Sequence, residues 1–405
     1  MNSYLPRKKF QLNKTIFLIF ILALLTRILF NIFYVGINDV PVADALDYHQ
    51  ISLNLLNNST YLSTSRAPLL PFFIAILYKA FGVNYFIVRI FLSIVSSFIC
   101  LTVYKITREL FNEQIALIAA FISSIYGMMF YWCGFLLTET LCTFFLTLAV
   151  LYLIKSSRHP RLRYLISGGI YLGLASLARP FVFPFFIVLP LWAFVSFGNN
   201  LKLASKAYLV ITFAMFLVIL PWVIRNYVVT HKFVFITSQG GQTFLGANNP
   251  KVLEYFKGGW IHPIESGLFN EKEISNYLKT LSSEEADKLC WKKGITFVSK
   301  NPLFTLKLVV YKFKLFWHLN KDTSFFSLEY FFVLLFAIYG SIRSLKNFAR
   351  TSILYLLPIF FTLMSLVFWG DDRIRSPIEP LLVIFAAYGI GCVLNEENYE
   401  QRAFS

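Results

Sequence analysis

The chain has 405 residues, of which 57% are hydrophobic, 18% are aromatic and only 14% are charged. Soluble domains carry about a quarter charged residues, so this composition excludes an ordinary soluble protein and indicates an all-α polytopic membrane protein. The formal net charge of +16 falls largely in short segments beside apolar runs. That placement is typical of cytoplasmic loops and of attraction to anionic lipid, and it argues against nucleic acid as a partner.

A basic segment, residues 7–9, precedes an apolar run from about Thr15 to Val35. A membrane span needs ~20 residues, and a signal-peptide core is shorter, so we expect an uncleaved first transmembrane helix. The further apolar runs of membrane length lie near residues 85–105, 115–132, 136–155, 164–178, 181–198, 206–224, 325–343, 352–369 and 376–394.

Short basic connections set the expected orientation. Residues 155–163 are basic with no acid, and the connections that hold Lys206 and Lys346 are basic as well. If these connections and the start of the chain are cytoplasmic, the chain has about ten spans with both termini in the cytoplasm. Residues 302–320 leave two alternatives, a lysine-bearing helix in the outer interface or an eleventh span.

Three segments follow from this topology. Residues 1–224 form a transmembrane catalytic module that includes a first outer loop, residues 36–84, with an amphipathic stretch at 68–81. Residues 225–324 form a second outer region and the interfacial helix, and residues 325–405 form the C-terminal transmembrane helices. In the second outer region, Ser282 and Glu285 have the spacing of a helix-capping box.

The first outer loop opens with the acids Asp44 and Asp47, which are three residues apart and therefore share one face of a helix. Two neighbouring acids raise each other's pKa, so one of them can serve as a base towards a hydroxyl group. The alternative is a purely structural role, in which one aspartate caps the helix and the other is a solvated acid. Arg66 precedes the amphipathic stretch and offers a bidentate fork for a phosphate at headgroup depth.

Further charged residues interrupt the ends of apolar runs, and the expected topology brings all of them to the outer side. They are Asp44, Asp47, Arg66, Glu139, Arg179, Arg225, Arg373 and Arg375. Each alone is an ordinary helix end, and Glu139 suits the N-terminus of the fourth span. Together they form a ring of arginines around two or three acids, which fits a reaction site on an anionic lipid substrate better than a channel.

Evidence for a metal is weak. His49 and His262 have acids nearby but no ligand spacing, and the five cysteines are scattered. We therefore expect no certain cofactor, and a divalent metal has no support beyond these two histidines. Arg27 and Asn31 share a face inside the first span, where a functional role and a structural partner on a neighbouring helix explain the arginine equally well.

The order of these motifs resembles that of the GT-C glycosyltransferases. The resemblance rests on Asp-x-x-x-Tyr in the first outer loop, Arg-x-Pro before the amphipathic stretch and Thr-Glu at the fourth span. Arg-Pro between two spans, Pro-Trp-x-x-Arg-Asn-Tyr at the seventh span and Arg-x-Arg-x-Pro near the C-terminus complete it. It extends from about residue 10 to residue 394. The branch it most resembles contains the bacterial relatives of the protein O-mannosyltransferases and the lipid A aminoarabinose transferase.

The resemblance implies roles for individual residues. Asp44 matches the catalytic aspartate of the first loop, Tyr48 matches the tyrosine four residues on, and Glu139 stands where a second acid lies near the site. Several relatives have an Asp-Glu pair where this chain has Ala45 after Asp44, which leaves Asp47 as an alternative base.

The remaining roles concern substrate contacts. Arg66 occupies the place of the residue that contacts the donor phosphate, and we expect help from Arg225, Arg373 and Arg375. The segment 240–250 resembles the outer loop after the seventh span. Substrate contacts are therefore expected from Tyr48, Arg179, Gly241 and Asn248.

The resulting hypothesis is a GT-C fold with about 10 transmembrane helices, or 11, and amphipathic helices on the outer face. The chain would transfer a sugar, with inversion, from a polyprenyl-phosphate donor to a hydroxyl of a lipid, polysaccharide or protein, at the periplasmic face of a bacterial inner membrane. One alternative is a transporter or flippase of lipid-linked sugars, which usually places charges at the midplane and has repeated halves. Another is a subunit that binds glycolipid without catalysis.

Overall fold

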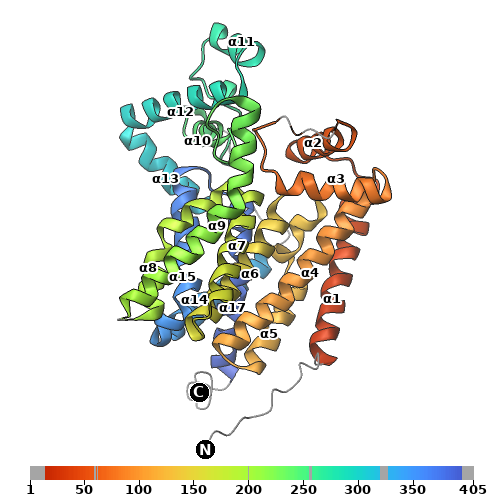
Figure 1. Cartoon of the computed structure of the whole chain (residues 1–405), viewed down its shortest axis with the longest axis vertical. Helices are drawn as coiled ribbons and strands as arrows, with labels where there is room; N and C mark the ends of the chain where they lie inside the picture. Colours follow the sequence, from red (N-terminus) through yellow and green to blue (C-terminus); the bar gives the residue numbers. More distant parts are fainter. Residues whose placement is uncertain are drawn as a thin grey trace, which may run out of the picture.

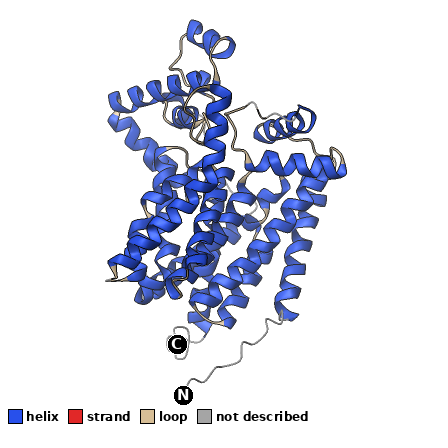
Figure 2. Ribbon diagram, in the orientation of Figure 1, coloured by secondary structure: helices blue, strands red, loops and turns tan. Residues whose placement is uncertain are grey.

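The computed structural model describes residues 14–58, 61, 63–198, 200–254, 258–319 and 327–394. Within these ranges all regular secondary structure is helical, which confirms the all-α prediction (Figure 2). The longer helices are α1 (Lys14–Phe30), α2 (Asp44–Asn58), α3 (Leu69–Phe81), α4 (Tyr85–Leu110), α5 (Glu113–Ile125), α6 (Glu139–Arg158), α7 (Leu162–Ala178), α8 (Leu189–Phe197), α9 (Leu201–Thr230), α10 (Gly240–Ala247), α11 (Glu271–Lys279), α12 (Ser283–Lys300), α13 (Pro302–Phe316), α14 (Ser327–Ser344), α15 (Phe348–Val367) and α17 (Glu379–Leu394). Shorter helical turns include η4 (Pro180–Ile187) and α16 (Asp372–Arg375).

The bundle is that of an integral membrane protein. Six segments in the described ranges are long and apolar enough to cross a membrane, or seven if the bent pair η4–α8 counts as one span. The apolar helices α3, α5 and α7 are shorter than 18 residues. One of the six segments, residues 328–367, is 40 residues long and contains both α14 and α15. The count of ten spans stays a prediction.

Helices α14 and α15 run in opposite directions. Tyr330, near the start of α14, donates a hydrogen bond to the carbonyl of Trp317, which follows α13. Val367, the last residue of α15, accepts a hydrogen bond from Lys312 of α13. Both ends therefore meet the same helix, and the turn between them lies at the other end of the bundle. Each helix is about as long as one span.

The intramembrane arginine of α1 has structural partners. Arg27 is fully buried, and its guanidinium donates to the carbonyls of Ser123 and Ser124, at 3.0 Å each, and to the hydroxyl of Ser96 at 2.9 Å. The two carbonyls belong to the last turn of α5, where a cation favours the negative end of the helix dipole. Arg27 thus ties α1 to α4 and α5, which favours the structural explanation over the functional one.

Polar side chains mark where helices begin. Asn84 and Asn112 accept hydrogen bonds from backbone amides in the first turns of α4 and α5, at 3.2 and 3.0 Å. Such caps satisfy amides that have no partner inside the helix. The capping box predicted for Ser282 and Glu285 is confirmed, because each side chain accepts from the other residue's backbone amide at the start of α12.

Six helices gather at one end of the bundle. In Figure 1, α2 and α3 lie over the upper ends of α1 and α4, and α10, α11 and α12 form a cap above α9. Helix α3 confirms the amphipathic stretch predicted at 68–81. Helix α13 leads from α12 back towards α15 and has 15 residues, fewer than a span requires, which favours the interfacial alternative. The described ends at Lys14 and Leu394 lie at the lower end of the bundle (Figure 1).

Candidate active site

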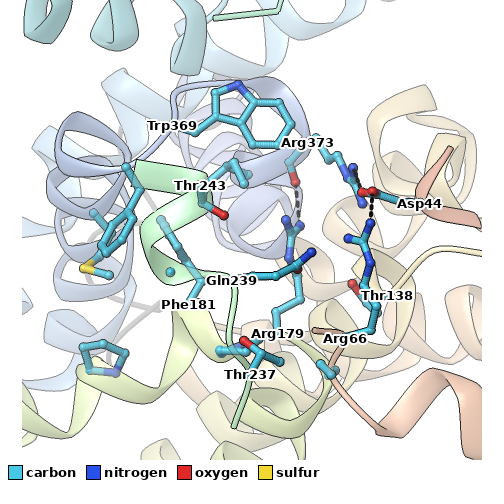
Figure 3. A pocket seen from close by; sticks show the side chains of 18 of the residues that line it. Asp44, Arg66, Thr138, Arg179, Phe181, Thr237, Gln239, Thr243, Trp369 and Arg373 are labelled. Atoms are coloured by element: carbon cyan, nitrogen blue, oxygen red, sulfur yellow. Dashed lines mark hydrogen bonds and ion pairs between the residues drawn. The ribbon is translucent and has the colours of Figure 1, made fainter. Parts of the chain in front are cut away.

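A cavity of about 260 Å³ lies where the upper ends of the bundle helices meet the outer helices. One wall is charged and contains Asp44, Arg66, Arg179 and Arg373 (Figure 3). The opposite wall is apolar. It is built by Phe181 and Pro184 of η4 and by Met364, Phe368 and Trp369 at the end of α15. A cavity of this kind can hold a ligand with an anionic group at one end and an apolar group at the other.

Asp44 lies between two guanidinium groups. Its Oδ1 is 2.6 Å from a terminal nitrogen of Arg66, and its Oδ2 is 2.7 Å from a terminal nitrogen of Arg373 (Figure 3). Burial by itself raises the pKa of Asp44, but the charges and hydrogen bonds of Arg66 and Arg373 outweigh burial and lower it. The carboxylate is therefore ionised at neutral pH and holds two cations at the cavity wall.

Asp47 shares one of these cations. It lies one turn further along α2, and its Oδ2 accepts from two nitrogens of Arg66, at 2.6 and 3.1 Å. The shared helix face predicted for Asp44 and Asp47 is therefore confirmed. Both acids occupy the first turn of α2, where the helix dipole stabilises negative charge. Asp47 is half exposed and does not line the cavity.

Glu139 supports the cations from behind. It is the first residue of α6 and is fully buried, and its Oε1 contacts Nε of Arg373 and, at 3.2 Å, a terminal nitrogen of Arg179. Its Oε2 has no hydrogen-bond partner in the described part of the chain. Arg179 also donates to the carbonyl of Arg373 at 3.1 Å. Glu139 thus fixes the two arginines without facing the cavity.

These contacts join three arginines to three carboxylates, so the network is formally neutral. A buried charge is stable only when it is paired, which explains why each guanidinium has an acid next to it. An anionic ligand entering the cavity would compete with Asp44 for Arg66 and Arg373. Its arrival would release the Asp44 carboxylate from its cations.

The loop that carries Arg66 is held from several sides. The hydroxyl of Tyr61 donates to the carbonyl of Arg66 at 2.9 Å, and the ring of Tyr48 lies 5.6 Å from its guanidinium. Thr64 bonds to the hydroxyl of Ser238 at 3.0 Å and to the carboxylate of Glu284. The first outer loop is therefore joined to both the segment after α9 and the start of α12, and Arg66 has a fixed place in the cavity wall.

Comparison with known proteins identifies the architecture. Residues 65–224 match the sequence family described as dolichyl-phosphate-mannose-protein mannosyltransferase. The oligosaccharyltransferase AglB from Archaeoglobus fulgidus, solved with an inhibitory peptide and a dolichol-phosphate, aligns over 94% of this chain and 50% of its own, with a TM-score of 0.61 and 18% identity. The apo form of the Archaeoglobus fulgidus oligosaccharyltransferase aligns over 96% of this chain and 52% of its own, with a TM-score of 0.60 and 17% identity.

The chain has the GT-C fold. It spans about half the length of the oligosaccharyltransferase chains that it matches. ArnT from Cupriavidus metallidurans, bound to undecaprenyl phosphate, aligns over 94% of this chain and 78% of its own, with 12% identity and a TM-score of 0.47. No curated protein sequence matches the chain significantly.

Two of the four arginines expected at the donor phosphate lie outside the cavity described above. Arg225 donates to the carbonyl of Ser63 at 3.2 Å, and its guanidinium stacks on Trp222 and Tyr61 at 4.5 and 4.9 Å. It therefore supports the loop that carries Arg66 and does not reach the cavity itself.

Arg375 is the second. It is fully buried, pairs with Glu379 at 2.5 Å and donates to the carbonyl of Phe316 at the end of α13. This pair links α16, α17 and α13, so Arg375 has a structural place. Glu379 did not stand out in the sequence analysis, although its i,i+4 spacing from Arg375 is a recognised signal of an ion pair within a helix.

Two residues of the segment 240–250 also lie outside the cavity. The amide of Gly241 donates to the Asp287 carboxylate at 2.7 Å, and a Cβ on Gly241 would lie 2.1 Å from the Asp287 carbonyl. Gly241 therefore allows α10 to approach α12. Asn248 is buried, and its side chain bonds to the carbonyl of Val367 at 3.0 Å and to the Lys312 amine at 2.8 Å.

Residues in and just before this segment line the cavity instead, together with Thr138 at the start of α6. They are Thr138, Thr237, Gln239, Gly240 and Thr243. Their hydroxyl and amide groups can hydrogen-bond a sugar. The Thr-Glu motif contains Thr138, and the segment 240–250 contains Gly240 and Thr243, whereas the sequence analysis had no signal for Thr237 and Gln239. Within the segment, Gly240 lines the cavity and the expected Gly241 does not.

The two histidines considered as metal ligands have other contacts. His49 Nδ1 lies 3.0 Å from the hydroxyl of Tyr78, and His262 accepts from the backbone amide of Ile264 at 3.4 Å. Burial lowers the pKa of both imidazoles, so they are neutral at neutral pH. Within the described ranges, no group of three or more His, Cys, Asp or Glu side chains is arranged to hold a metal ion.

Proposed function

We propose that the chain is an inverting glycosyltransferase. It moves a hexosyl or pentosyl group from a polyprenyl-phosphate donor to a hydroxyl group of a lipid, polysaccharide or protein. The observation that carries this proposal is the Asp44 carboxylate between Arg66 and Arg373 on the wall of a cavity whose opposite wall is apolar. The fold match and the family match over residues 65–224 support a transferase, and they give no support to the transporter alternative.

The donor phosphate would lie against the arginines. A guanidinium offers a planar fork that matches phosphate oxygens, and Arg66 and Arg373 present two such groups on one wall. The apolar wall from η4 and α15 suits the first isoprene units of the carrier. The solved relatives carry a dolichol-phosphate and an undecaprenyl phosphate, which are lipids of this class.

The reaction would be a single displacement. Asp44 takes the proton of the acceptor hydroxyl, and the oxygen attacks the anomeric carbon from the side opposite the phosphate. The bond between the anomeric carbon and the phosphate oxygen breaks, and its electron pair stays on the phosphate. Arg66 and Arg373 stabilise that developing negative charge, while Glu139 holds Arg373 and Arg179 in position.

Phosphate binding and base activation are linked in this scheme. Both oxygens of Asp44 face cations in the structure, which makes the carboxylate a weak base. A donor phosphate that takes over Arg66 and Arg373 removes part of that stabilisation, and the pKa of Asp44 rises. The base is thereby strengthened only when the donor is in place.

We place the cavity on the periplasmic side of a bacterial inner membrane, with both termini in the cytoplasm. Glu139 begins α6 at the cavity, and α6 ends at Arg158 in the basic connection to α7, so the two lie at opposite ends of one span-length helix. Basic connections of this kind stay in the cytoplasm.

The decisive experiment compares two aspartate variants in cells. Cells that lack the protein are complemented with wild type, Asp44→Asn or Asp47→Asn, and their polyprenyl-phosphate lipids are measured by mass spectrometry. We expect a glycosylated carrier to accumulate without the protein, to fall with wild type and with Asp47→Asn, and to persist with Asp44→Asn. The accumulated carrier also identifies the donor sugar.

Asp47→Asn is the matched control because it removes the same charge from the same turn of α2 and from the same arginine. Equal amounts of each variant in the membrane exclude a folding defect. If the glycosylated carrier falls with Asp44→Asn and persists with Asp47→Asn, the base is Asp47. Clearance by both variants would contradict the acid–base mechanism.

A further inference from the structure

A long basic segment lies at the cavity end of the molecule. Residues 288–314, which cover most of α12 and nearly all of α13, contain seven lysines and no acid. Outer segments close to spans are normally poor in lysine and arginine, because the positive-inside rule concentrates these residues in the cytoplasm. In the orientation proposed above, this segment is an exception to the positive-inside rule, which indicates that its positive charge binds an anionic partner.

Two of the seven lysines are already used inside the fold. Lys293 pairs with Glu273 at 3.0 Å and donates to the carbonyl of Leu268 at 2.8 Å. Lys312 is buried and donates to Asn248 and to the last carbonyls of α15. The other five are exposed and form no ion pair within the described ranges; we call them the lysine strip. They are Lys288, Lys292, Lys300, Lys307 and Lys314.

The strip continues from one helix onto the next. Lys288 and Lys292 are four residues apart and share one face of α12, and Lys300 lies two turns further on, about 80° around the helix from Lys292. Lys307 and Lys314 are seven residues apart on one face of α13. The two helices join at Asn301, and α13 leads from α12 towards the upper end of α15 (Figure 1).

Apolar side chains lie beside the strip on α13. Leu303, Leu306, Val310 and Phe313 are 79%, 61%, 49% and 42% exposed, and their spacing of three and four residues forms a single stripe. An exposed apolar stripe with flanking lysines is the pattern of a helix that lies in the membrane interface. Neutral lipid would satisfy the stripe but leave the ammonium groups without counter-charge.

The upper part of the strip borders a cavity of about 380 Å³ on α12. Lys292, Lys300 and Thr296 line it together with Glu273 and Lys293, and Leu289 and Phe297 supply apolar wall. The Glu273 carboxylate is paired with Lys293, so Lys292 and Lys300 leave the hollow with a net positive charge that suits a phosphate group with an apolar neighbour. The cavity shares no lining residue with the candidate active site.

We propose that the lysine strip and the apolar stripe of α13 bind anionic phospholipid in the leaflet on the cavity side of the membrane, and that the hollow on α12 seats one lipid phosphate. Each lysine close to an anionic surface adds to the attraction, so five together give a marked preference for anionic over neutral lipid. This binding needs no glycosyl transfer, so its test and that of the proposed function fail independently.

The test measures which lipid lies beside α13. All five native cysteines are buried, so a fluorophore on Leu303→Cys reports one position. The full-length protein is placed in nanodiscs that contain a small fraction of spin-labelled phosphatidylglycerol or spin-labelled phosphatidylcholine. We expect severalfold stronger quenching by the anionic probe and a loss of this preference at high salt. Equal quenching by the two probes would overturn the proposal.

Two charge variants localise the effect. Lys307→Gln with Lys314→Gln should reduce the preference for the anionic probe, whereas Lys202→Gln with Lys206→Gln should leave it unchanged. The second pair removes the same charge from exposed positions at the start of α9, at the opposite end of the bundle. If both pairs lower the preference equally, the strip is not the binding surface.

A further arm distinguishes lipid from soluble polyanions. Added polyanionic polysaccharide should not restore the fluorescence that spin-labelled phosphatidylglycerol quenches. Full restoration would mean that the strip prefers a glycan, and the assignment to lipid would be wrong. The salt dependence is measured in the labelled Leu303→Cys protein without any lysine variant, so a folding defect in a lysine variant does not remove the test.

Discussion

Arg66→Gln separates the two roles that the structure gives to this arginine. One nitrogen of Arg66 contacts both Asp44 and Asp47 at 2.6 Å, and a second contacts Asp47 at 3.1 Å. The Arg66 side chain is 15% exposed, so water replaces it poorly. Glutamine keeps a polar end group but is shorter and carries no charge. The variant therefore tests the cation itself, with the loop still held through Tyr61.

The expected loss of rate follows from the leaving group. Removing one donor that stabilises a developing anion costs about 10²- to 10³-fold in kcat, or about 2.7–4 kcal/mol. Arg373 remains on the other side of Asp44 and keeps part of the stabilisation. We therefore expect the lower part of that range, with a smaller effect on KM because the lipid tail still binds.

The pH dependence supplies an independent readout. Burial raises the pKa of Asp44 and the two arginines lower it, so loss of Arg66 moves the pKa upwards. The acid limb of kcat/KM reports the free enzyme, and it should move to higher pH in Arg66→Gln. The sign is the same for stability. Because the pKa of Asp44 is lower in the folded protein than its unfolded value of 3.8, Asp44 stabilises the fold at pH values above 3.8 and loses this contribution on acidification. In Arg66→Gln the pKa of Asp44 is lowered less, so its contribution to stability is smaller.

The assay follows sugar transfer from the carrier identified in cells, with purified protein in nanodiscs, over a range of pH. Arg163→Gln is the control, because Arg163 is an exposed arginine at the other end of the bundle. A kcat that stays within about threefold of wild type would refute the role at the leaving phosphate. An acid limb that does not move would refute the electrostatic link to Asp44.

Two further substitutions test the framework around the cavity. Gly241→Ala should lower the free energy of unfolding by about 1–3 kcal/mol, because its Cβ meets the carbonyl of Asp287. Gly240→Ala should be close to wild type in stability, since its Cβ lies 3.4 Å from the Trp291 ring. Thermal unfolding in detergent compares the two variants, and equal stability would contradict this explanation. Burial lowers the pKa of Lys312 to about 7, from an ordinary value of 10.5. Between these two pH values Lys312 is protonated in the unfolded chain and neutral in the folded protein, so the free energy of unfolding of the wild type should rise with pH. Lys312→Met should flatten that slope in denaturant titrations at several pH values, and an unchanged slope would show that another group causes it.

The sequence predicted the helices and the acids of the cavity well, for identifiable reasons. Apolar runs and capping residues define most helices locally, and the box at Ser282 and Glu285 is one example. The acids Asp44 and Asp47 are three residues apart at a helix start, which by itself puts both near one partner. Their partner Arg66 was expected at the donor phosphate, and it lines the cavity beside them.

Two of the four expected contacts that lie outside the cavity have a neighbour on the same helix that does line it. Arg373 and Arg375 are two residues apart, so their side chains point about 200° apart around α16. One reaches the cavity and the other is buried against Glu379. Gly240 and Gly241 differ in the same way, since only the first lines the cavity. A motif indicates which turn lies at the cavity, but packing against α12 and α13 decides which residue of that turn lines it.

The ion pair between Asp44 and Arg373 joins residues 329 positions apart, near the two ends of the chain. During synthesis, Asp44, Arg66 and Glu139 are therefore made long before Arg373 emerges, and the buried Glu139 loses a principal cation whenever α16 is absent. In a nascent or truncated chain without α16, Glu139 keeps only Arg179 and Asp44 keeps only Arg66, so each carboxylate has lost one of its two cations. Completion of the cavity is thus one of the last steps of biogenesis.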